Sequence, residues 1–341
     1  AVSSGKNLAL AIVENNPAIG ILQVAQGLAV PKGLDPSKPA RSPERVDLGI
    51  VTEVILRRGC PYVEFRTRVD NTAKDHRLRV AFPTDIDSRV GYAGQPFDVV
   101  ERPVQPEQVN HYDTGDCEPF VGYHPMHDFC GISDGRTGVT LAGDGIMEYE
   151  ILPMRKTLCF TLMRTTDRLH VGVMATGSKF AVPAAQLLGE NTFRYAFIPY
   201  SGTYEASLAA VERFRQPIIA VQKDFLEEES MPDYEAPEPD LPQQGGFVRV
   251  DGGCIVTALK PAEDGEGAIL RLYNPADDNR PTRITVAPEF ALQRAESVRL
   301  DETTEGIVPV SANTLDVMVG PRKIFSARLV MAIHEPKETL P

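Results

Sequence analysis

Hydrophobic and polar residues alternate with a period of two along much of the chain. Between Tyr62 and Asp70, Val63, Phe65, Thr67 and Val69 alternate with Glu64, Arg66, Arg68 and Asp70. This pattern predicts a half-buried strand whose charged residues face solvent. Further strand-like runs lie at 51–57, 78–82, 129–132, 139–141, 159–163, 171–174 and 193–198. Because Gly, Pro, Asp and Asn separate these short runs, we expect mainly β structure, with antiparallel sheets packed as sandwiches.

Helix is scarce, and its clearest candidate is Glu205–Arg215, where apolar residues fall at helical spacing before Pro217. An acidic, proline-rich stretch at 226–245 has few apolar residues and is predicted to be a linker. It would separate a large β-sandwich domain at 1–225 from a smaller β-sandwich domain at 246–341. The second domain is expected to contain strands near 253–259, 268–274, 283–286, 315–319 and 324–333.

Charge and composition exclude several classes of partner. The chain has 35 basic and 47 acidic residues, a formal charge of −12, so it lacks the basic surface that binds nucleic acid or anionic membranes. It has no apolar run near the ~20 residues that span a bilayer. The five cysteines are odd in number and widely spaced, which indicates reduced thiols and a cytoplasmic location. Since residue 1 is Ala rather than Met, we expect a piece of a longer chain.

Two local patterns could carry chemistry. His111 and Asp113, followed by Cys117, have side chains that can bind zinc, although such a triplet arises often by chance. Glu148 and Glu150 would share one face of a strand and could act as paired acids, yet a half-exposed strand gives the same alternation. The structural interpretation of the glutamates is favoured. No nucleophile elbow, phosphate-binding loop or HExxH motif occurs.

A longer segment is more specific. The run 69–83, VDNTAKDHRLRVAFP, resembles a strand, turn and strand of bacterial family 38 glycoside hydrolases, the α-mannosidases and mannosylglycerate hydrolases. Other segments follow in the order found in that family: 97–103, 124–135 (HPMHDFCGISDG), 138–141, 145–150 (GIMEYE), 161–164, 186–189 with 193–199, and 270–275 (LRLYNP). The similarity extends over residues 50 to 275 and is weaker to the end, whereas 1–49 match no pattern.

The resemblance implies a parent enzyme whose N-terminal catalytic domain carries zinc, held by His and Asp, and an aspartate nucleophile that hydrolyses α-mannosides with retention. The HxDPxW-type zinc motif of that domain is absent here, and the chain contains no Trp. We therefore expect no catalytic residue and no cofactor in this chain. His111 and Asp113 lie where the family has no zinc ligands. The expected partners are the catalytic domain of the same polypeptide, a mannose-containing substrate and further copies of the chain.

The residues most open to a functional role are Asp75, His76, Arg77 and Arg79, joined by His124 of the HPM segment. Two guanidiniums beside an acid and an imidazole could form a bidentate network. Arg77 and Arg79 would share one face of a strand. A salt-bridge network that pins the β domain to the catalytic domain is favoured over direct contact with sugar at the rim of the site.

Two other hypotheses remain open at this point. One is a stand-alone carbohydrate-binding β-sandwich with an exposed groove lined by Tyr92, Tyr123 and Tyr149, although the lack of Trp makes it less favourable. The other is an independent zinc hydrolase built on His111 and Asp113.

Overall fold

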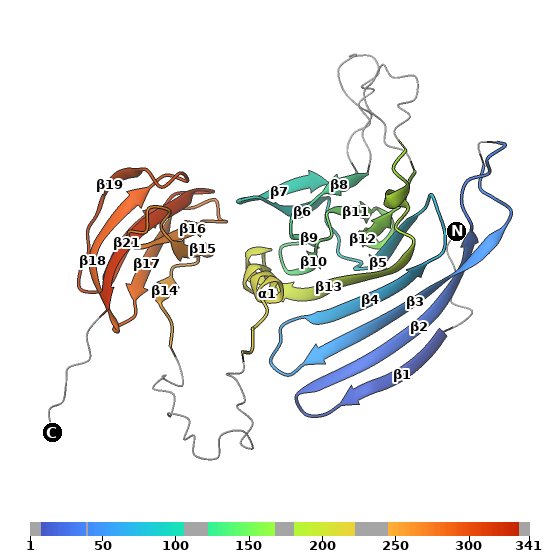
Figure 1. The fold of residues 1–341 in the computed structure, drawn as a ribbon, viewed down its shortest axis with the longest axis horizontal. Coiled ribbons are helices and arrows are strands. Elements are labelled where there is room, and N and C mark those ends of the chain that lie inside the picture. The colour runs from blue at the N-terminus through green and yellow to red at the C-terminus, as the bar shows by residue number, and fades with distance from the viewer. Residues whose placement is uncertain (1–7, 39, 106–121, 168–180, 222–244, 334–341) are drawn as a thin grey trace, which may run out of the picture. The chain divides into compact units, whose positions relative to one another are not determined.

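The chain divides into two compact units, Ala1–Pro217 and Ile218–Pro341 (Figure 1). The computed structural model describes residues 8–38, 40–105, 122–167, 181–221 and 245–333. Almost all of the predicted linker at 226–245, and the predicted strand at 171–174, lie outside these ranges. The placement of the domain boundary in the linker therefore stays a prediction. No helix in the described ranges is long and apolar enough to cross a membrane.

The described residues of the first unit form two antiparallel sheets. The larger has nine strands in the order β1-β2-β3-β4-β13-β10-β9-β6-β7, and the smaller has four in the order β5-β12-β11-β8. The strands are β1 Leu8–Asn15, β2 Ile19–Pro31, β3 Arg45–Arg57, β4 Val63–Asn71, β5 Arg77–Phe82, β6 Val90–Gln95, β7 Asp98–Pro103, β8 Tyr123–Pro125, β9 Phe129–Ser133, β10 Thr137–Asp144, β11 Glu148–Leu152, β12 Thr157–Arg164 and β13 Gly189–Ser201. The predicted antiparallel sandwich is confirmed.

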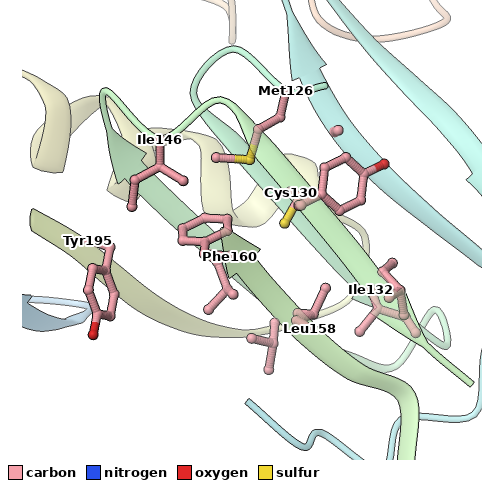
Figure 2. Close-up of a cluster of buried hydrophobic side chains, with 12 residues drawn as sticks. Met126, Cys130, Ile132, Ile146, Leu158, Phe160 and Tyr195 are labelled. Carbon is pink, nitrogen blue, oxygen red and sulfur yellow. The ribbon is translucent and has the colours of Figure 1, made fainter. Parts of the chain in front are cut away.

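The two sheets enclose one apolar core. β9, β10 and β13 of the large sheet supply Cys130, Leu141 and Tyr195, and β12 of the small sheet supplies Leu158 and Phe160. Figure 2 shows Cys130, Tyr195, Leu158 and Phe160 gathered in this cluster. All five are almost fully buried. β9, β10 and β12 are buried on both faces, so they appear in the sequence as short apolar runs between turn residues rather than as alternating segments.

The single α-helix of the described residues, α1 (Glu205–Arg215), covers the opposite face of the large sheet at β10 and β13. Its bounds match the predicted helix. Leu208, Val211 and Phe214 are buried on the side facing the sheet. Two short 3₁₀ turns, η2 Met154–Lys156 and η3 Pro183–Gln186, complete the unit.

One charged residue of β4 is not where alternation predicts it. Glu64 was expected to face solvent, but its side chain is only 2 % exposed and is surrounded by the guanidiniums of Arg57, Arg66 and Arg194 at 2.6, 2.9 and 3.1 Å. Burial alone would raise the pKa of the Glu64 carboxyl, but hydrogen bonds from the three arginines outweigh it and bring the pKa below its usual value. Arg194 also lies 4.0 Å above the ring of Phe214, so this cluster joins the sheet to α1.

The second unit is a smaller β-sandwich with sheets in the orders β14-β17-β20 and β15-β16-β21-β18-β19. Its strands are β14 Val248–Asp251, β15 Ile255–Pro261, β16 Ala268–Tyr273, β17 Arg280–Val286, β18 Phe290–Val298, β19 Thr304–Val308, β20 Thr314–Val319 and β21 Ile324–Ile333. Leu272, Ile284, Leu315 and Leu329 are among the side chains of its own core.

A buried asparagine stabilises a turn in each unit. Asn71 donates through Nδ2 to the carbonyls of residues 186 and 187 at 2.9 Å, and its Oδ1 accepts from the amide of Ala73. Asn274 makes the same kind of contact, donating to three carbonyls and accepting from the amide of Ala276. Because a buried carbonyl without a partner is costly, these side chains hold the neighbouring loops against the sheets.

Candidate functional site on the outer face of the small sheet

Two arginines and two glutamates form a charged ladder on the outer face of the four-stranded sheet. Arg77 and Arg79 lie on β5, and Glu148 and Glu150 lie on β11, with β12 between these strands. Residues two apart on a strand share a face, so both pairs project away from the core. The predicted common face of Arg77 and Arg79 is confirmed. We refer to these four residues as the ladder.

Small side chains on β12 allow the arginines to cross it. Arg79 is the register partner of Thr161, and Glu150 is the register partner of Cys159. The distance across two strand spacings is roughly 10 Å, within the reach of an extended Arg and Glu pair. Thr161 and Cys159 are buried although they lie on the outer face.

Each arginine of the ladder meets one glutamate. Arg77 Nη2 lies 3.1 Å from Glu148 Oε1, and Arg79 Nη1 contacts Glu150 Oε2. Thr161 adds a hydroxyl hydrogen bond to Glu148 at 2.6 Å. The four charged side chains are 20 to 33 % exposed, so they are partly desolvated without being buried. The alternation predicted for the glutamates is confirmed, since Tyr149 between them is buried in the core.

The ring of Tyr123 on β8 and the guanidinium of Arg164 on β12 extend the ladder. The guanidinium carbon of Arg77 lies 4.4 Å from the centre of the Tyr123 ring, and that of Arg164 lies 5.7 Å from it. A cation over an aromatic face contributes about 0.5–1 kcal/mol at a partly exposed site. Arg164 is exposed. The face therefore offers one cation and one aromatic edge in addition to its internally paired charges.

Asp75 and His76, which we expected beside the arginines, make other contacts. Asp75 Oδ1 accepts from Gln186 Nε2 at 2.6 Å, and its amide donates to Gln186 Oε1 at 2.9 Å. With φ of 55°, Asp75 turns the chain between β4 and β5, and Arg41 donates to its carbonyl. The His76 amide donates to Thr165 Oγ1 at 2.9 Å. The structure thus divides the predicted cluster into a turn and a ladder.

His76 and His124 are both partly buried histidines. Burial lowers the pKa of His76, and the Nε2 atom of its ring is buried without a hydrogen bond among the described residues. Burial and then the charge of Arg102 lower the pKa of His124. His124 is the register partner of Tyr149, and their ring centres lie 5.7 Å apart on the inner face. It therefore lies across the sheet from the ladder, beside a cavity of only about 10 Å³.

The groove of three tyrosines is not present. Tyr92 is 4 % exposed and Tyr149 is 1 % exposed, because both rings project into packed layers. The rings of Phe129 and Tyr204 pack against the Tyr92 ring, and its hydroxyl bonds the hydroxyls of Thr140 and Tyr200 at 2.7 Å, so no face of the ring is open to a sugar. Of the three, Tyr123 alone keeps partial exposure. The groove that would favour a stand-alone sugar-binding protein is therefore not formed by these three tyrosines.

The zinc candidates cannot be placed. His111, Asp113 and Cys117 lie outside the described residues. Within the described ranges, no three His, Cys, Asp or Glu side chains gather as a metal site. Burial raises the pKa of the Cys130 and Cys159 thiols, which makes both poor nucleophiles.

Two family models match the chain. The model described as "Glycosyl hydrolases family 38 C-terminal domain" matches residues 37–168, and the one described as "Glycosyl hydrolases family 38 C-terminal beta sandwich domain" matches residues 253–326. The chain belongs to the C-terminal region of glycoside hydrolase family 38. The first match contains the whole ladder, and the second contains Asn274 and most of the smaller sandwich.

Curated relatives and solved structures extend the comparison. A protein of Halalkalibacterium halodurans named "Putative mannosylglycerate hydrolase" is 28 % identical over an alignment of 332 residues that covers 93 % of this chain and 34 % of that protein. Human alpha-mannosidase 2C1 is 25 % identical over 228 residues, 65 % of this chain and 18 % of that protein. The chain thus spans about a third or less of the length of these relatives.

The fold is shared with an alpha-mannosidase from Enterococcus faecalis. Its crystal structure superimposes on 95 % of this chain and 35 % of that one, with a TM-score of 0.76 and 23 % identity. A second Enterococcus faecalis structure, of a family 38 protein, gives a TM-score of 0.74 with 95 % and 36 % coverage and 23 % identity. These two structural similarities show that the fold is shared.

Sequence reasoning had missed the partners of the two arginines. The signal was present, because Arg-x-Arg at 77–79 and Glu-x-Glu at 148–150 have the same spacing and opposite charge. When two strands with such patterns lie in one sheet, each arginine of one can pair with a glutamate of the other. The sequence did not indicate that β12 would separate them.

Proposed function

We propose that this chain forms the non-catalytic C-terminal β region of an α-mannosidase-like glycoside hydrolase and that it is inactive by itself. The family matches and the one-third coverage of the relatives support this assignment. The zinc ion, the carboxylate nucleophile and the retaining hydrolysis of α-mannosides then belong to the remainder of the polypeptide. A cytoplasmic location is part of the same proposal, based on the unpaired cysteines.

The state of Glu148 and Glu150 is the observation that carries the non-catalytic assignment. A retaining glycosidase needs one protonated carboxyl to donate to the leaving group and one carboxylate free to attack the sugar. Here each carboxylate is already bound by a guanidinium, and Glu148 also accepts from Thr161. Carboxylates that are engaged in this way favour a structural role.

The outer face of the small sheet is the surface that we assign to contact with the catalytic region of the same polypeptide. The charges of the ladder are paired within the chain, so covering these four residues would leave none of them unpaired. Tyr123 and Arg164 provide the aromatic and guanidinium groups that are enriched in interfaces. A mannose-containing substrate would come near this face only at its rim.

An activity assay tests the inactive part of the proposal. The purified chain, at high concentration and with added zinc, is expected to release no phenol from an aryl α-mannoside above the buffer rate. Turnover by the chain that disappears in Glu148→Gln or Glu150→Gln would refute the proposal and make these residues catalytic. Turnover that persists in both variants would also contradict inactivity.

A binding assay tests the interface. A separately produced family 38 catalytic region is expected to bind the chain, and Arg79→Ala is expected to weaken that binding about tenfold, a typical loss for an interface arginine. Arg283→Ala is the matched control, since Arg283 forms a similar Arg–Asp pair on the smaller sandwich. Equal binding by both variants would exclude the ladder from the interface.

A further inference from the structure

The smaller sandwich has a hollow on the outer face of its three-stranded sheet. The hollow measures about 680 Å³ and lies across β14, β17 and β20. Gly252, which follows β14, forms part of its floor. A methyl group on Gly252 would lie 2.2 Å from the carbonyl oxygen of Pro281, so glycine is needed for the chain to lie this close to β17. The volume is within the range of roughly 300–1,000 Å³ found for small-molecule sites.

Four charged side chains form a row across this face. Asp251 on β14 is the register partner of Arg283 on β17, and Arg283 is the register partner of Asp316 on β20. The Nε and Nη2 atoms of Arg283 donate to the two carboxylate oxygens of Asp316 at 2.8 and 2.9 Å. Arg249, two residues before Asp251 on the same face, donates to that carboxylate at 3.0 and 3.1 Å. We call Arg249, Asp251, Arg283 and Asp316 the row.

The row carries no net charge, and this decides the class of ligand. It contains two guanidiniums and two carboxylates, and each carboxylate is already bound by a guanidinium. A cation or an anion therefore meets only charges that are already paired. The guanidiniums keep further N–H groups and the carboxylates keep further lone pairs, which alternate at the strand spacing of about 4.8 Å. Hydroxyl groups suit such a row because each of them can both donate and accept.

Two apolar side chains lie beside the row. Pro281 and Met318 are register partners on the same outer face, and Met318 is 63 % exposed. A pyranose ring carries its hydroxyls around its edge and C–H groups on its faces. One sugar could therefore reach the polar row and the apolar pair together, which is the combination of groups that small-molecule sites use.

The exposure of the row favours a small hydrated ligand over a covering protein surface. Its four side chains are 49 to 78 % exposed, whereas those of the ladder are 20 to 33 % exposed. A protein surface laid over the row would remove water from four ions, which is costly. Sugar hydroxyls would replace that water with hydrogen bonds of the same kind.

We propose that this hollow is a non-catalytic binding site for a neutral glycoside, whose hydroxyls bond Asp251 and Arg283 while its C–H face packs on Pro281 and Met318. The choice of a mannoside as that glycoside rests on the proposed function of the polypeptide. The site would hold mannose units of a longer substrate away from the bond that is cleaved. None of the described residues that line the hollow is aromatic, so the expected dissociation constant is about millimolar.

Titration of the whole chain with methyl α-mannoside and with an α-linked mannobiose, followed by amide chemical shifts, tests the site. Saturable shifts are expected at residues 249–252, 282–283 and 316–318, and Arg283→Ala should raise the dissociation constant at least tenfold. Arg155→Ala is the matched control, because Arg155 forms an equally exposed pair with Asp85 through two hydrogen bonds in the first unit. Circular dichroism checks that both variants are folded.

Four results would overturn the proposal. The first is the lack of saturable shifts at these residues up to about 100 mM mannoside. The second is equal binding by folded Arg283→Ala, and the third is tighter binding of inorganic phosphate or Ca²⁺ at the same residues. The fourth is loss of the mannoside shifts when a separately produced family 38 catalytic region is added, which would show that the rest of the polypeptide covers this face. Failure of the proposed function would instead appear as turnover of an aryl α-mannoside, which this titration does not measure.

Discussion

The buried carboxylate of Glu64 allows a quantitative prediction about the stability of the first unit. Replacing it by Gln keeps the shape of the side chain but leaves Arg57, Arg66 and Arg194 without their shared anion. Removing one partner of a fully buried ion pair costs about 3–5 kcal/mol. These guanidiniums are 23 to 49 % exposed, so water screens part of the loss, and we expect about 2–3 kcal/mol.

Differential scanning calorimetry measures the effect on the transition of the larger unit. For a domain of about 200 residues, 1 kcal/mol corresponds to about 2–4 °C in Tm, so Glu64→Gln should lower Tm by about 5–10 °C. The matched control is Glu190→Gln. Glu190 pairs with Arg68 at 3.8 Å, with both side chains more than half exposed, and its loss should change Tm by about 2 °C or less.

The pH dependence of the difference in Tm between the parent and Glu64→Gln supplies a second criterion. The pKa of Glu64 is lowered in the folded state, so its contribution is fully present above the unfolded pKa of about 4.5 and is lost as the pH falls through the folded value. The gap in Tm between the parent and Glu64→Gln should therefore narrow from about pH 5 to about pH 3. Equal shifts for Glu64→Gln and Glu190→Gln, or a gap independent of pH, would refute the reasoning.

Three further predictions concern other buried groups. Asn71→Ala should destabilise the first unit, and Asn274→Ala the second, each by about 1–3 kcal/mol, because each removes hydrogen bonds to at least two carbonyls, one of them buried; in calorimetry each variant should move a different transition. The lowered pKa of His76 means that the unfolded chain binds more protons below about pH 6.5, so stability should fall as the pH drops through that region, and less steeply in His76→Gln as read from urea midpoints. Gly131→Ala should cost about 2 kcal/mol or more, since its methyl group would lie 2.1 Å from the Tyr92 hydroxyl; a soluble, unchanged variant would show that the sheet yields there.

The sequence predicted most strands that have one charged and one apolar face. It also predicted α1, because the helical spacing ends at a proline. The first two strands were not recognised, since β1 and β2 carry apolar or neutral residues on both faces, with Glu14 the one exception, and so lack the contrast on which alternation depends.

The contacts of the candidate site required the sheet order. Local alternation could place Arg77 and Arg79 together, but their partners are about 70 residues away across an intervening strand. Glu64 was predicted to be exposed for the same reason. Its partner Arg194 comes from β13, and the local sequence around Glu64 holds no information about that strand. Asp75 was predicted to join a charged network. Instead its backbone is left-handed and its side chain bonds Gln186, so it forms part of a turn.

The strand order of the large sheet has a consequence for synthesis on the ribosome. β1 to β4 form a consecutive meander that can fold as it emerges, but β4 pairs next with β13, which begins at Gly189. At about 5–20 residues per second, on the order of ten seconds pass before that strand is made. During this time the nascent sheet has an open edge on each side, β1 and β4. The side chains of Phe65 and Val69, which face the core in the folded chain, have no core to pack against. The half-made chain is therefore the stage at which chaperones are most needed, and synonymous changes that slow translation between β4 and β13 should increase misfolding without altering a single residue.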